Sequence, residues 1–391
     1  MKTLKDVEIQ SKKVLMRVDF NVPMDEEQSI INNTKITAAL PTINYILDQG
    51  ASLILMSHLG RPHGEKNEKF SLKPVGECLA SLLEAKVIMA DDCIGDKVKE
   101  QINNMKTGEV LLLENVRFHK GEETNEPGFA RQLAELGDIY VNDAFGSAHR
   151  AHASTAGVTK FMPAYSGLLM EKEVQMLKEV LEHPESPRMG ILGGSKVKDK
   201  LGLIRNLMEK LDVILIGGGM ANTFLQAAGF NTGQSKVEKQ LLDEARKLIA
   251  NAEDKKMKLI LPVDVVVAKE ISEDAEATVV DVANVPDDMM ILDIGPKSIK
   301  LFVEEIKKAR TIVWNGPLGV YEYEQFAAGT KEIVKSIAES SAVSVIGGGD
   351  SAAAVQNMGL EESITHISTG GGATLEFMEG LPMPGIVACG N

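Results

Sequence analysis

The sequence contains few cysteines and no long hydrophobic run, and both absences restrict its class. Its three cysteines, Cys78, Cys93 and Cys389, are odd in number, widely separated and not spaced as metal ligands. We therefore expect a reducing, cytoplasmic setting and no disulfide framework. No apolar stretch approaches the length that crosses a bilayer, and the N-terminus lacks the hydrophobic region of a signal peptide. The sequence thus predicts a protein that is neither membrane-spanning nor exported.

Basic charge is also scarce. The formal net charge is −14 at pH 7, with 42 basic and 56 acidic residues. Nucleic acids and anionic membranes bind broad basic surfaces, so neither is expected as a partner. The composition is otherwise ordinary for a globular protein, with 44% hydrophobic and 25% charged residues. A chain of 391 residues is long for one hydrophobic core, which predicts two domains.

Short apolar runs rich in β-branched residues alternate with longer helical patterns along the chain, which is typical of βα units and a parallel sheet. Between the halves, a helical stretch from Gly167 to His183 ends at Pro184 and is interpreted as a rigid linking helix. The predicted fold is α/β, with two Rossmann-like domains, each a parallel sheet flanked by helices, joined by a linking helix and hinge. The expected strands are 14–18, 53–56, 110–113 and 139–142, then 189–192, 213–216, 259–261, 312–314, 343–346 and 366–368.

Basic and amide side chains follow the predicted strands of the first half. In open α/β sheets, ligands bind outside the carboxyl ends of the strands. The planar fork of arginine matches carboxylate and phosphate oxygens, so several arginines at one edge predict a small, multiply anionic substrate. Taken singly, each residue is better explained as a surface ion-pair partner, a structural histidine or a turn former before Pro23. The set is Asp19, Asn21, His58, Arg61, Arg117 and Arg150.

Glycine clusters follow the predicted strands of the second half. Glycine lets backbone N–H groups approach a phosphate, and a helix N-terminus adds a favourable dipole. One such cluster is more often turn geometry than a ligand site. Repetition on consecutive strands of one sheet favours a nucleotide. The clusters are residues 193–194, 217–219, 347–349 and 370–372, with Asn315-Gly316-Pro317 after another strand.

The kind of nucleotide site is restricted by two missing motifs. Neither the G-x-x-x-x-G-K-[ST] P-loop nor an early G-x-G-x-x-G is present, which disfavours a P-loop enzyme and a nicotinamide dehydrogenase. Lys196 and Lys200 are four residues apart just after a glycine turn, which predicts one helix face. Surface solubility is the ordinary explanation of such lysines, but this position favours phosphate contact. Asp350 suits either a Mg²⁺ ligand or a helix N-cap.

Over essentially its whole length, the chain resembles the phosphoglycerate kinase family. The motifs are long and occur in order: RVDFNVP at 17–23, SHLGRP at 57–62, LENVRF at 113–118, NDAFGSAHRAH at 142–152, GGSKV at 193–197, WNGPLGV at 314–320 and GGGD at 347–350. The resemblance implies that the first domain binds 3-phosphoglycerate or 1,3-bisphosphoglycerate. The second would bind ADP or ATP with Mg²⁺, in a monomeric enzyme that closes by hinge bending.

Matching motif positions also imply roles for single residues. Asp350 would hold Mg²⁺, and the catalytic set would be Lys35, Lys196, Lys200 and Gly371. The phosphoglycerate would be bound by Asp19, Asn21, Lys35, His58, Arg61, Arg117 and Arg150. The nucleotide would be bound by Lys196, Lys200, Gly218, Gly219, Gly295, Asn315, Glu322, Gly347, Gly348, Gly349, Asp350 and Ser351. The implied domains are 1–169 for phosphoglycerate, 170–184 as linking helix, 185–373 for nucleotide, and 374–391 returning to the first domain.

Two positions depart from the family pattern. Lys35 stands where the family places an arginine that stabilises the transferred phosphoryl group. This lysine keeps the charge but loses the bidentate fork. Ser351 stands where threonine is common and keeps the hydroxyl.

The implied chemistry is direct in-line phosphoryl transfer between 1,3-bisphosphoglycerate and ADP. In the reverse direction the attacking carboxylate is already ionised, so the reaction needs alignment and charge neutralisation and no general base. Two rival hypotheses are a catalytically silent binding protein that lost activity through Lys35, and a dehydrogenase, which the missing fingerprint disfavours.

Overall fold

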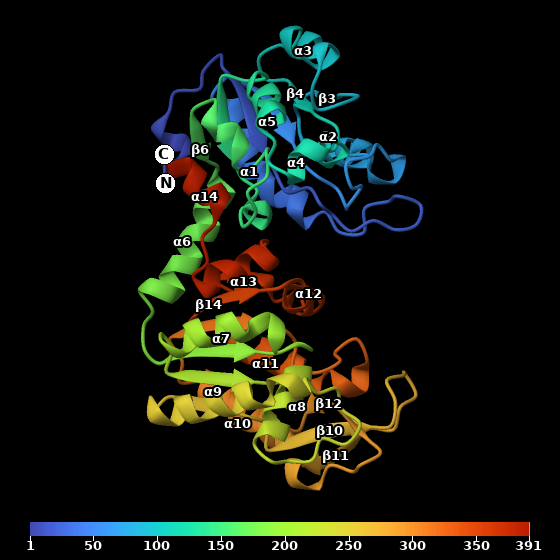
Figure 1. The fold of residues 1–391 in the computed structure, drawn as a ribbon, viewed down its shortest axis with the longest axis vertical. Coiled ribbons are helices and arrows are strands. Elements are labelled where there is room, and N and C mark those ends of the chain that lie inside the picture. Colours follow the sequence, from blue (N-terminus) through green and yellow to red (C-terminus); the bar gives the residue numbers. More distant parts are fainter. Residues whose placement is uncertain (391) are drawn as a thin grey trace. The chain divides into compact units, whose positions relative to one another are not determined.

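The computed structural model describes residues 1–390, which form two compact units (Figure 1). Unit 1 contains Met1–Gln175 and the C-terminal residues from Pro382, and unit 2 contains Met176–Leu381. Within residues 1–390, no helix has both the length and the apolar composition needed to cross a membrane. The α/β fold class predicted from the sequence is confirmed.

Unit 1 is built on a six-stranded sheet in the order β3-β4-β2-β1-β5-β6, in which every pair is parallel. All carboxyl ends therefore meet at one edge of the sheet. The four strands predicted in the first half are present, and the short strands β3 and β6 are additional. The strands are β1 (Lys13–Arg17), β2 (Ser52–Met56), β3 (Val87–Met89), β4 (Val110–Leu112), β5 (Ile139–Asn142) and β6 (Ala164–Ser166).

Helices cover both faces of this sheet because alternate strand residues point to opposite sides. Val14 and Met16 of β1 pack in one core with α1 and α2, whereas Leu15 packs in a second core with α3 and α5. Helix α1 buries Ile36 and Ile43, seven residues apart on one face. The helices are α1 (Thr34–Asp48), α2 (Lys73–Leu82), α3 (Asp96–Asn103), α4 (Lys120–Glu123), α5 (Pro127–Ala134) and α14 (Pro384–Val387).

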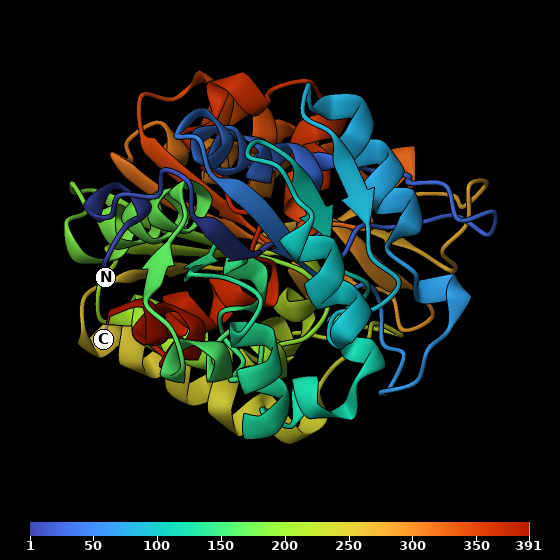
Figure 2. The same cartoon turned by 90° about the horizontal axis from the view of Figure 1, so that it is seen from above.

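Both ends of the described chain lie in unit 1. The backbone N–H of Lys2 donates to the carbonyl of Cys389 at 3.0 Å, and the two chain ends are marked side by side in Figures 1 and 2. Helix α6 (Leu168–Glu182) begins in unit 1 and ends in unit 2, over most of the stretch predicted as a linking helix. Of the predicted return segment 374–391, only residues from Pro382 group with unit 1, because α13 packs against α7 in unit 2.

Unit 2 is built on a second parallel six-stranded sheet, in the order β15-β14-β13-β7-β8-β9. Ile191 of β7 packs with Phe302 of α10 and Ile333 of α11 in the core on one face. The strands are β7 (Arg188–Leu192), β8 (Val213–Ile216), β9 (Lys258–Ile260), β13 (Thr311–Asn315), β14 (Val343–Gly347) and β15 (His366–Ile367). The helices are α7 (Leu201–Met208), α8 (Gly218–Ala227), α9 (Leu242–Asp254), α10 (Pro296–Ile306), α11 (Ala328–Glu339), α12 (Gly349–Asn357) and α13 (Gly372–Glu379).

Unit 2 also contains a three-stranded antiparallel sheet that the sequence did not predict. Its order is β11-β10-β12, with β10 (Asp264–Ala268), β11 (Thr278–Asp281) and β12 (Met290–Ile294). Strand β11 is largely exposed, so its residues lack the apolar pattern of a buried parallel strand. The β-branched run in β10, Val265–Val267, was the signal available in the sequence.

Candidate active site

The carboxyl ends of the unit 1 sheet bring together several of the predicted side chains. Strands β4, β2, β1 and β5 are consecutive in the sheet, so the segments that follow them lie next to one another. Gly60, after β2, joins three of these segments. Its N–H donates to Oδ1 of Asn21 at 2.9 Å, and its carbonyl accepts from the guanidinium of Arg117 at 2.9 Å. These two hydrogen bonds therefore fix the segments that follow β1, β2 and β4 relative to one another.

Lys35 reaches this edge from the first turn of α1. Its Nζ lies 3.0 Å from a carboxylate oxygen of Asp19, and both side chains are partly buried. The structure thus places Lys35 beside the predicted phosphoglycerate-binding residues. The ion pair also restricts the ammonium group to one side of the Asp19 carboxylate, which a freely rotating surface lysine would not show.

His58 is buried against a guanidinium that the sequence analysis did not select. One terminal nitrogen of Arg17 lies 3.0 Å from Nδ1 of His58, and Nε of Arg17 donates to the Ser154 hydroxyl at 2.7 Å. Burial, with the positive charges of Arg17 and Arg117, lowers the pKa of His58 well below its ordinary value. His58 is therefore a neutral imidazole. Because Nδ1 faces a donor, its hydrogen is carried on Nε2.

A second set of buried side chains contacts Ser154, the hydrogen-bond partner of Arg17. Glu122 of α4 is fully buried and accepts hydrogen bonds from the N–H and hydroxyl of Ser154, at 2.9 and 2.7 Å. Burial raises the pKa of Glu122, and burial lowers the pKa of neighbouring His152 to about 4. Sequence reasoning missed Arg17, Glu122, His152 and Ser154. Arg17 had one signal, a charge at the end of an apolar strand, whereas Glu122 looked like an ordinary helix surface residue.

Two of the predicted arginines stand apart from this network. Arg61 and Arg150 are exposed. Within residues 1–390, the side chain of Arg61 makes no hydrogen bond or ion pair, and the side chain of Arg150 donates only to the ring of His149, at 3.1 Å. Arg117, by contrast, is buried and has its Nε 3.5 Å from the Glu123 carboxylate. Hydrogen bonds and an ion pair therefore link Asp19, Asn21, Lys35 and Arg117, with Gly60 between Asn21 and Arg117. His58 is held by Arg17, and Arg61 and Arg150 lie at the surface.

In unit 2, the glycine-rich strand ends surround a cavity of about 320 Å³. Strands β15, β14, β13 and β7 are consecutive in the sheet, and the loops after all of them contribute to the wall. Predicted site residues in the lining are Lys196, Lys200, Asn315, Gly348, Gly349, Asp350, Ser351 and Gly371, joined by residues such as Ser195, Asp199 and Leu375.

Lys200 is a buried cation in the wall of this cavity. It is 8% exposed, and its Nζ donates to the carbonyls of Gly193 and Asn315 at 2.5 and 3.0 Å. Burial lowers its pKa to about 8, which Asp350 and Asp199 oppose, so it stays mostly protonated at neutral pH. The prediction of one α-helical face was wrong. Residues 198–200 form a 3₁₀ turn before α7, and Lys196 precedes that turn and is exposed. The two lysines therefore share the cavity wall and not a helix face.

The amide of Asn315 gives the cavity a polar donor without a protein partner. Its Nδ2 is buried and makes no hydrogen bond within residues 1–390. A Cβ on Gly348 would lie 3.0 Å from this nitrogen, and Gly348 has a φ of +94°. Glycine is therefore required here by both backbone conformation and space. A buried unpaired N–H beside a buried cation is the arrangement that an anionic ligand satisfies.

Asp350 lies at the start of α12, but it is not the N-cap that the sequence allowed. The N-cap is Gly348, and no side chain caps this helix. Within residues 1–390, the Asp350 carboxylate makes no hydrogen bond or ion pair and lines the cavity. Burial and the negative charges of Asp350 and Glu322 raise the pKa of Tyr321. A carboxylate in this position provides an oxygen ligand for a divalent cation.

The remaining predicted nucleotide residues lie outside the cavity wall. A Cβ on Gly218 would lie 2.6 Å from the Pro317 carbonyl, and Gly295 is the N-cap of α10 with its Cα against the Asp264 carboxylate. Both glycines therefore have packing reasons of their own. Glu322 is exposed. The predicted residues not in the lining are Gly218, Gly219, Gly295, Glu322 and Gly347.

Comparisons with known proteins agree with a site of this chemistry. A family model described as phosphoglycerate kinase matches residues 4–381. The chain is similar to a phosphoglycerate kinase of Pelotomaculum thermopropionicum, with 54% identity over 99% of this chain and 98% of the relative. A relative in Moorella thermoacetica carries the same name, with 54% identity and the same coverage. The solved phosphoglycerate kinase of Coxiella burnetii superposes with a TM-score of 0.89 and 41% identity, covering 99% of this chain and 98% of that one. The Pyrococcus horikoshii structure gives a TM-score of 0.87 and 36% identity, covering 100% and 98%.

Proposed function

Because the chain belongs to the phosphoglycerate kinase family, we propose that each unit binds one of the two substrates of that kinase. Membership makes the chain a glycolytic phosphotransferase with a carboxyl group as acceptor, acting on phosphoglycerate and a nucleotide. It transfers a phosphoryl group reversibly between 1,3-bisphosphoglycerate and ADP to give 3-phosphoglycerate and ATP. The assignment of single residues, the metal ion and the closing motion belong to the proposal.

Unit 1 is proposed to hold the phosphoglycerate. Arg61 and Arg150 are exposed guanidinium groups whose forks can meet a phosphate, and Arg117 is fixed at the same sheet edge by the Gly60 carbonyl. His58, neutral because it is buried, can donate from Nε2 without adding charge. Asp19 and Asn21 offer acceptors for a hydroxyl group. This division between phosphate donors and hydroxyl acceptors matches a small sugar-acid phosphate.

Unit 2 is proposed to hold the nucleotide phosphates in the glycine-rich cavity. Lys200 and Lys196 supply positive charge, the Asn315 amide supplies a donor, and glycine backbones permit close approach. Mg²⁺ suits the unpaired Asp350 carboxylate, since phosphate-bound Mg²⁺ takes only one or two protein oxygens. When bound there, the ion would neutralise charge on phosphate oxygens. The Ser351 hydroxyl, which accepts from the N–H of Gly316 at 2.7 Å, fixes the adjoining loop.

The residues around the reacting groups are proposed to act by position and charge. The attacking carboxylate of 3-phosphoglycerate is already ionised, so no side chain has to remove a proton. Lys35, Lys196 and Lys200 would stabilise charge on the transferred group, and Gly371 would present the start of α13 to it. Lys35 lacks the fork of the family arginine and is also paired with Asp19 at 3.0 Å. Its contribution is therefore that of a single ammonium group.

Substrates held by separate units have to be brought together before transfer, so we include hinge closure in the proposal, with α6 as the connecting element. The proposal also includes that the enzyme is monomeric and cytoplasmic. The three cysteines, Cys78, Cys93 and Cys389, are free thiols, as in a reducing compartment. Small-angle scattering should show compaction when both ligands are bound, and unchanged dimensions would contradict closure.

The observation that carries the proposal is the unit 2 cavity, where a buried ammonium and an unpartnered amide meet among glycines. The test is a coupled assay for ATP-dependent phosphorylation of 3-phosphoglycerate by the purified chain. We expect turnover that requires Mg²⁺. Folded protein that binds both ligands without turnover would instead establish the silent binding protein. Oxidation of NADH coupled to reduction of a substrate, with no turnover of ATP, would instead establish the dehydrogenase.

A further inference from the structure

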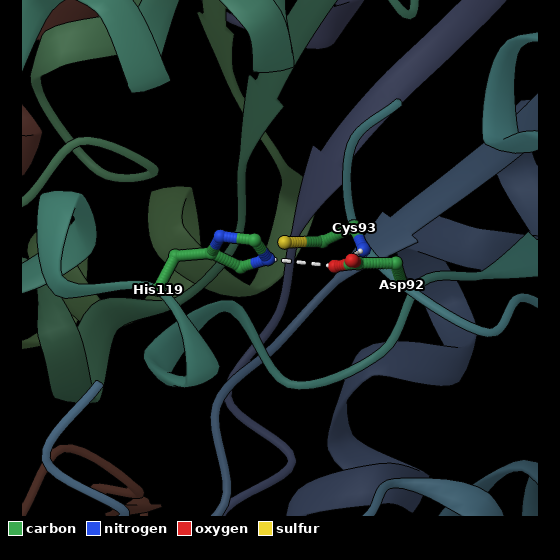
Figure 3. Close-up of side chains that lie close together, drawn as sticks. All are labelled: Asp92, Cys93 and His119. Carbon is green, nitrogen blue, oxygen red and sulfur yellow. Dashed lines mark hydrogen bonds and ion pairs between the residues drawn. The ribbon is translucent and has the colours of Figure 1, made fainter. Parts of the chain in front are cut away.

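A cluster outside both proposed substrate sites combines a carboxylate, a thiol and an imidazole. Asp92 and Cys93 follow strand β3, and His119 lies between the 3₁₀ turn Val116–Phe118 and helix α4. Figure 3 shows the three side chains converging, with the sulfur of Cys93 beside the imidazole ring and the carboxylate of Asp92 facing its nitrogen. One ligand atom from each residue lies within 4.8 Å of the others.

Direct contacts hold the cluster together. Nε2 of His119 lies 2.6 Å from Oδ1 of Asp92, and the backbone N–H of Cys93 donates to the same oxygen at 2.7 Å. The imidazole is stacked on Phe129, with ring centroids 5.1 Å apart and an interplanar angle of 22°. The ring is therefore oriented by packing.

The cluster has one buried anchor and two accessible groups. Cys93 is fully buried in the core that contains Phe129, whereas the side chains of His119 and Asp92 are 29% and 51% exposed. An ion from solvent can therefore reach the imidazole and the carboxylate and meet the sulfur beneath them. The spacing of cysteines in the sequence gave no sign of this, because the three ligands come together only in the fold.

We propose that Asp92, Cys93 and His119 bind one Zn²⁺ ion in a site with an open fourth position. Sulfur, nitrogen and carboxylate oxygen are the donors that Zn²⁺ takes, whereas Mg²⁺ and Ca²⁺ prefer oxygen alone. Three protein ligands leave one tetrahedral position for water. The site is distinct from the proposed Mg²⁺ position at Asp350, which lies in unit 2.

The geometry requires a small adjustment on binding. With bonds of about 2.0 Å to nitrogen and oxygen, tetrahedral ligands are about 3.3 Å apart. The present 2.6 Å between His119 and Asp92 therefore has to widen by about 0.7 Å as the ion replaces the shared hydrogen. Both residues are partly exposed and can move by this amount. The Zn²⁺ ion would then join the segment after β3 to the segment that carries Arg117, two residues before His119.

The alternative is an ion pair next to an inert core thiol. Without a cation, burial and the Asp92 carboxylate raise the pKa of the Cys93 thiol well above its ordinary value, so the thiol is protonated. A divalent ion reverses this balance by binding the thiolate and releasing its proton. The two descriptions therefore differ in whether sulfur bonds to metal, which is directly observable.

Co²⁺ is the probe, because thiolate-bound Co²⁺ gives a near-ultraviolet charge-transfer band and four-coordinate Co²⁺ gives strong visible bands. The full chain, freed of metal by a chelator and dialysed, is titrated with Co²⁺ alone. We expect both bands to saturate at one ion per chain and to be lost on adding one equivalent of Zn²⁺. Zn²⁺ should also raise the thermal unfolding midpoint.

Variants assign the ligands. Cys93→Ser should lose the charge-transfer band, and His119→Gln and Asp92→Asn should weaken Co²⁺ binding by at least about tenfold. Cys78→Ser, which alters a half-buried thiol elsewhere in unit 1, is the matched control and should bind like the parent. If Cys93→Ser does not fold, as judged by circular dichroism, the His119→Gln titration decides the question. The absence of a charge-transfer band in the parent overturns the proposal. Parent-like binding by His119→Gln, or equal loss in Cys78→Ser, also overturns it.

Discussion

The two proposed substrate sites lie at equivalent edges of two parallel sheets, yet different chemical groups line them. In unit 1 the strand ends carry polar and charged side chains, one of which, His58, is held by a buried network that includes Arg17 and Glu122. In unit 2 the strand ends carry glycine, and the wall is largely backbone with one buried ammonium, Lys200. The same topology thus supports side-chain recognition in one unit and backbone recognition in the other.

The two sites should therefore respond differently to mutation. Unit 1 uses many charges, so the loss of one leaves others to bind the substrate. Unit 2 uses one buried cation and closely packed glycines. Loss of that charge, or addition of a Cβ to a glycine, should therefore weaken ligand binding more, because few other groups can compensate.

The largest effect is expected for Lys200→Met in unit 2. The substitution keeps the length of the side chain but removes the ammonium group and leaves the carbonyls of Gly193 and Asn315 without their donor. We expect kcat to fall by about 10³-fold, the effect of losing one preorganised charge in a catalytic site. Steady-state assays measure this, with the exposed Lys198→Met as control. Equal rates for the two variants would contradict the assigned role of Lys200.

A buried carboxyl group in unit 1 should make folding stability depend on pH. Burial, with a contribution from Glu173, raises the pKa of Asp143 from 3.8 to about 6, and its Oδ1 accepts from the N–H of Met170 at the start of α6. A raised pKa in the folded state gives stability that is complete below about pH 4 and lost as the pH rises through 6. Asp143→Asn keeps the acceptor and abolishes this titration.

Relative to that variant, the parent should lose about 2.4 kcal/mol of unfolding free energy between pH 4 and pH 7. Urea unfolding followed by circular dichroism at several pH values measures the difference. In unit 2, burial raises the pKa of Asp293 to about 7, so Asp143→Asn should leave that second dependence in place. A difference between parent and variant that does not change with pH would refute the assignment.

Lys35→Ala should have the next largest effect, in unit 1. Its Nζ lies 3.0 Å from Asp19, and its removal takes away one of several positive charges at that edge. We expect kcat to fall by about 10²-fold, less than for Lys200→Met, because arginines remain. Lys35→Arg restores the planar fork and should preserve or raise the rate. Turnover like that of the parent in Lys35→Ala would exclude Lys35 from the transition state.

The smallest effect is expected for Gly348→Ala. Its Cβ would lie 3.0 Å from Nδ2 of Asn315, on a backbone with a φ of +94°. We expect nucleotide affinity to fall by about tenfold from strain and lost space, with phosphoglycerate affinity unchanged. Gly359→Ala is a matched control, since Gly359 also has positive φ (+64°) but an added Cβ meets nothing within 4 Å. Calorimetric titrations with each ligand measure both. Equal losses in the two variants would show that backbone strain alone is responsible.

The fold could be predicted where the sequence pattern is dictated by the environment. Strands buried on both faces, such as β2 and β13, are continuous apolar runs, and each predicted parallel strand is present. The antiparallel sheet was missed because β11 is exposed and its pattern is not that of a buried strand. The 3₁₀ turn at 198–200 was missed because spacing alone does not separate it from an α-helix.

Local sequence pattern also decided which site residues could be predicted. Residues directly after strands, such as His58 and Asp350, were predicted because parallel strands end at one edge. Glu122 was missed because its burial depends on Ser154 folding back over α4, a tertiary contact with no local pattern. The N-cap interpretation of Asp350 was wrong because the N-cap is Gly348, which has positive φ and lies two residues earlier.

Hydrogen–deuterium exchange of the full chain with each ligand separately tests most directly whether the two substrates occupy different units. With 3-phosphoglycerate alone, we predict slower amide exchange in residues 57–61 and 115–118 of unit 1. With Mg-ADP alone, we predict slower exchange in residues 193–200 and 347–351 of unit 2. Protection of the unit 2 glycine segments by 3-phosphoglycerate, with none at the unit 1 strand ends, would contradict the account.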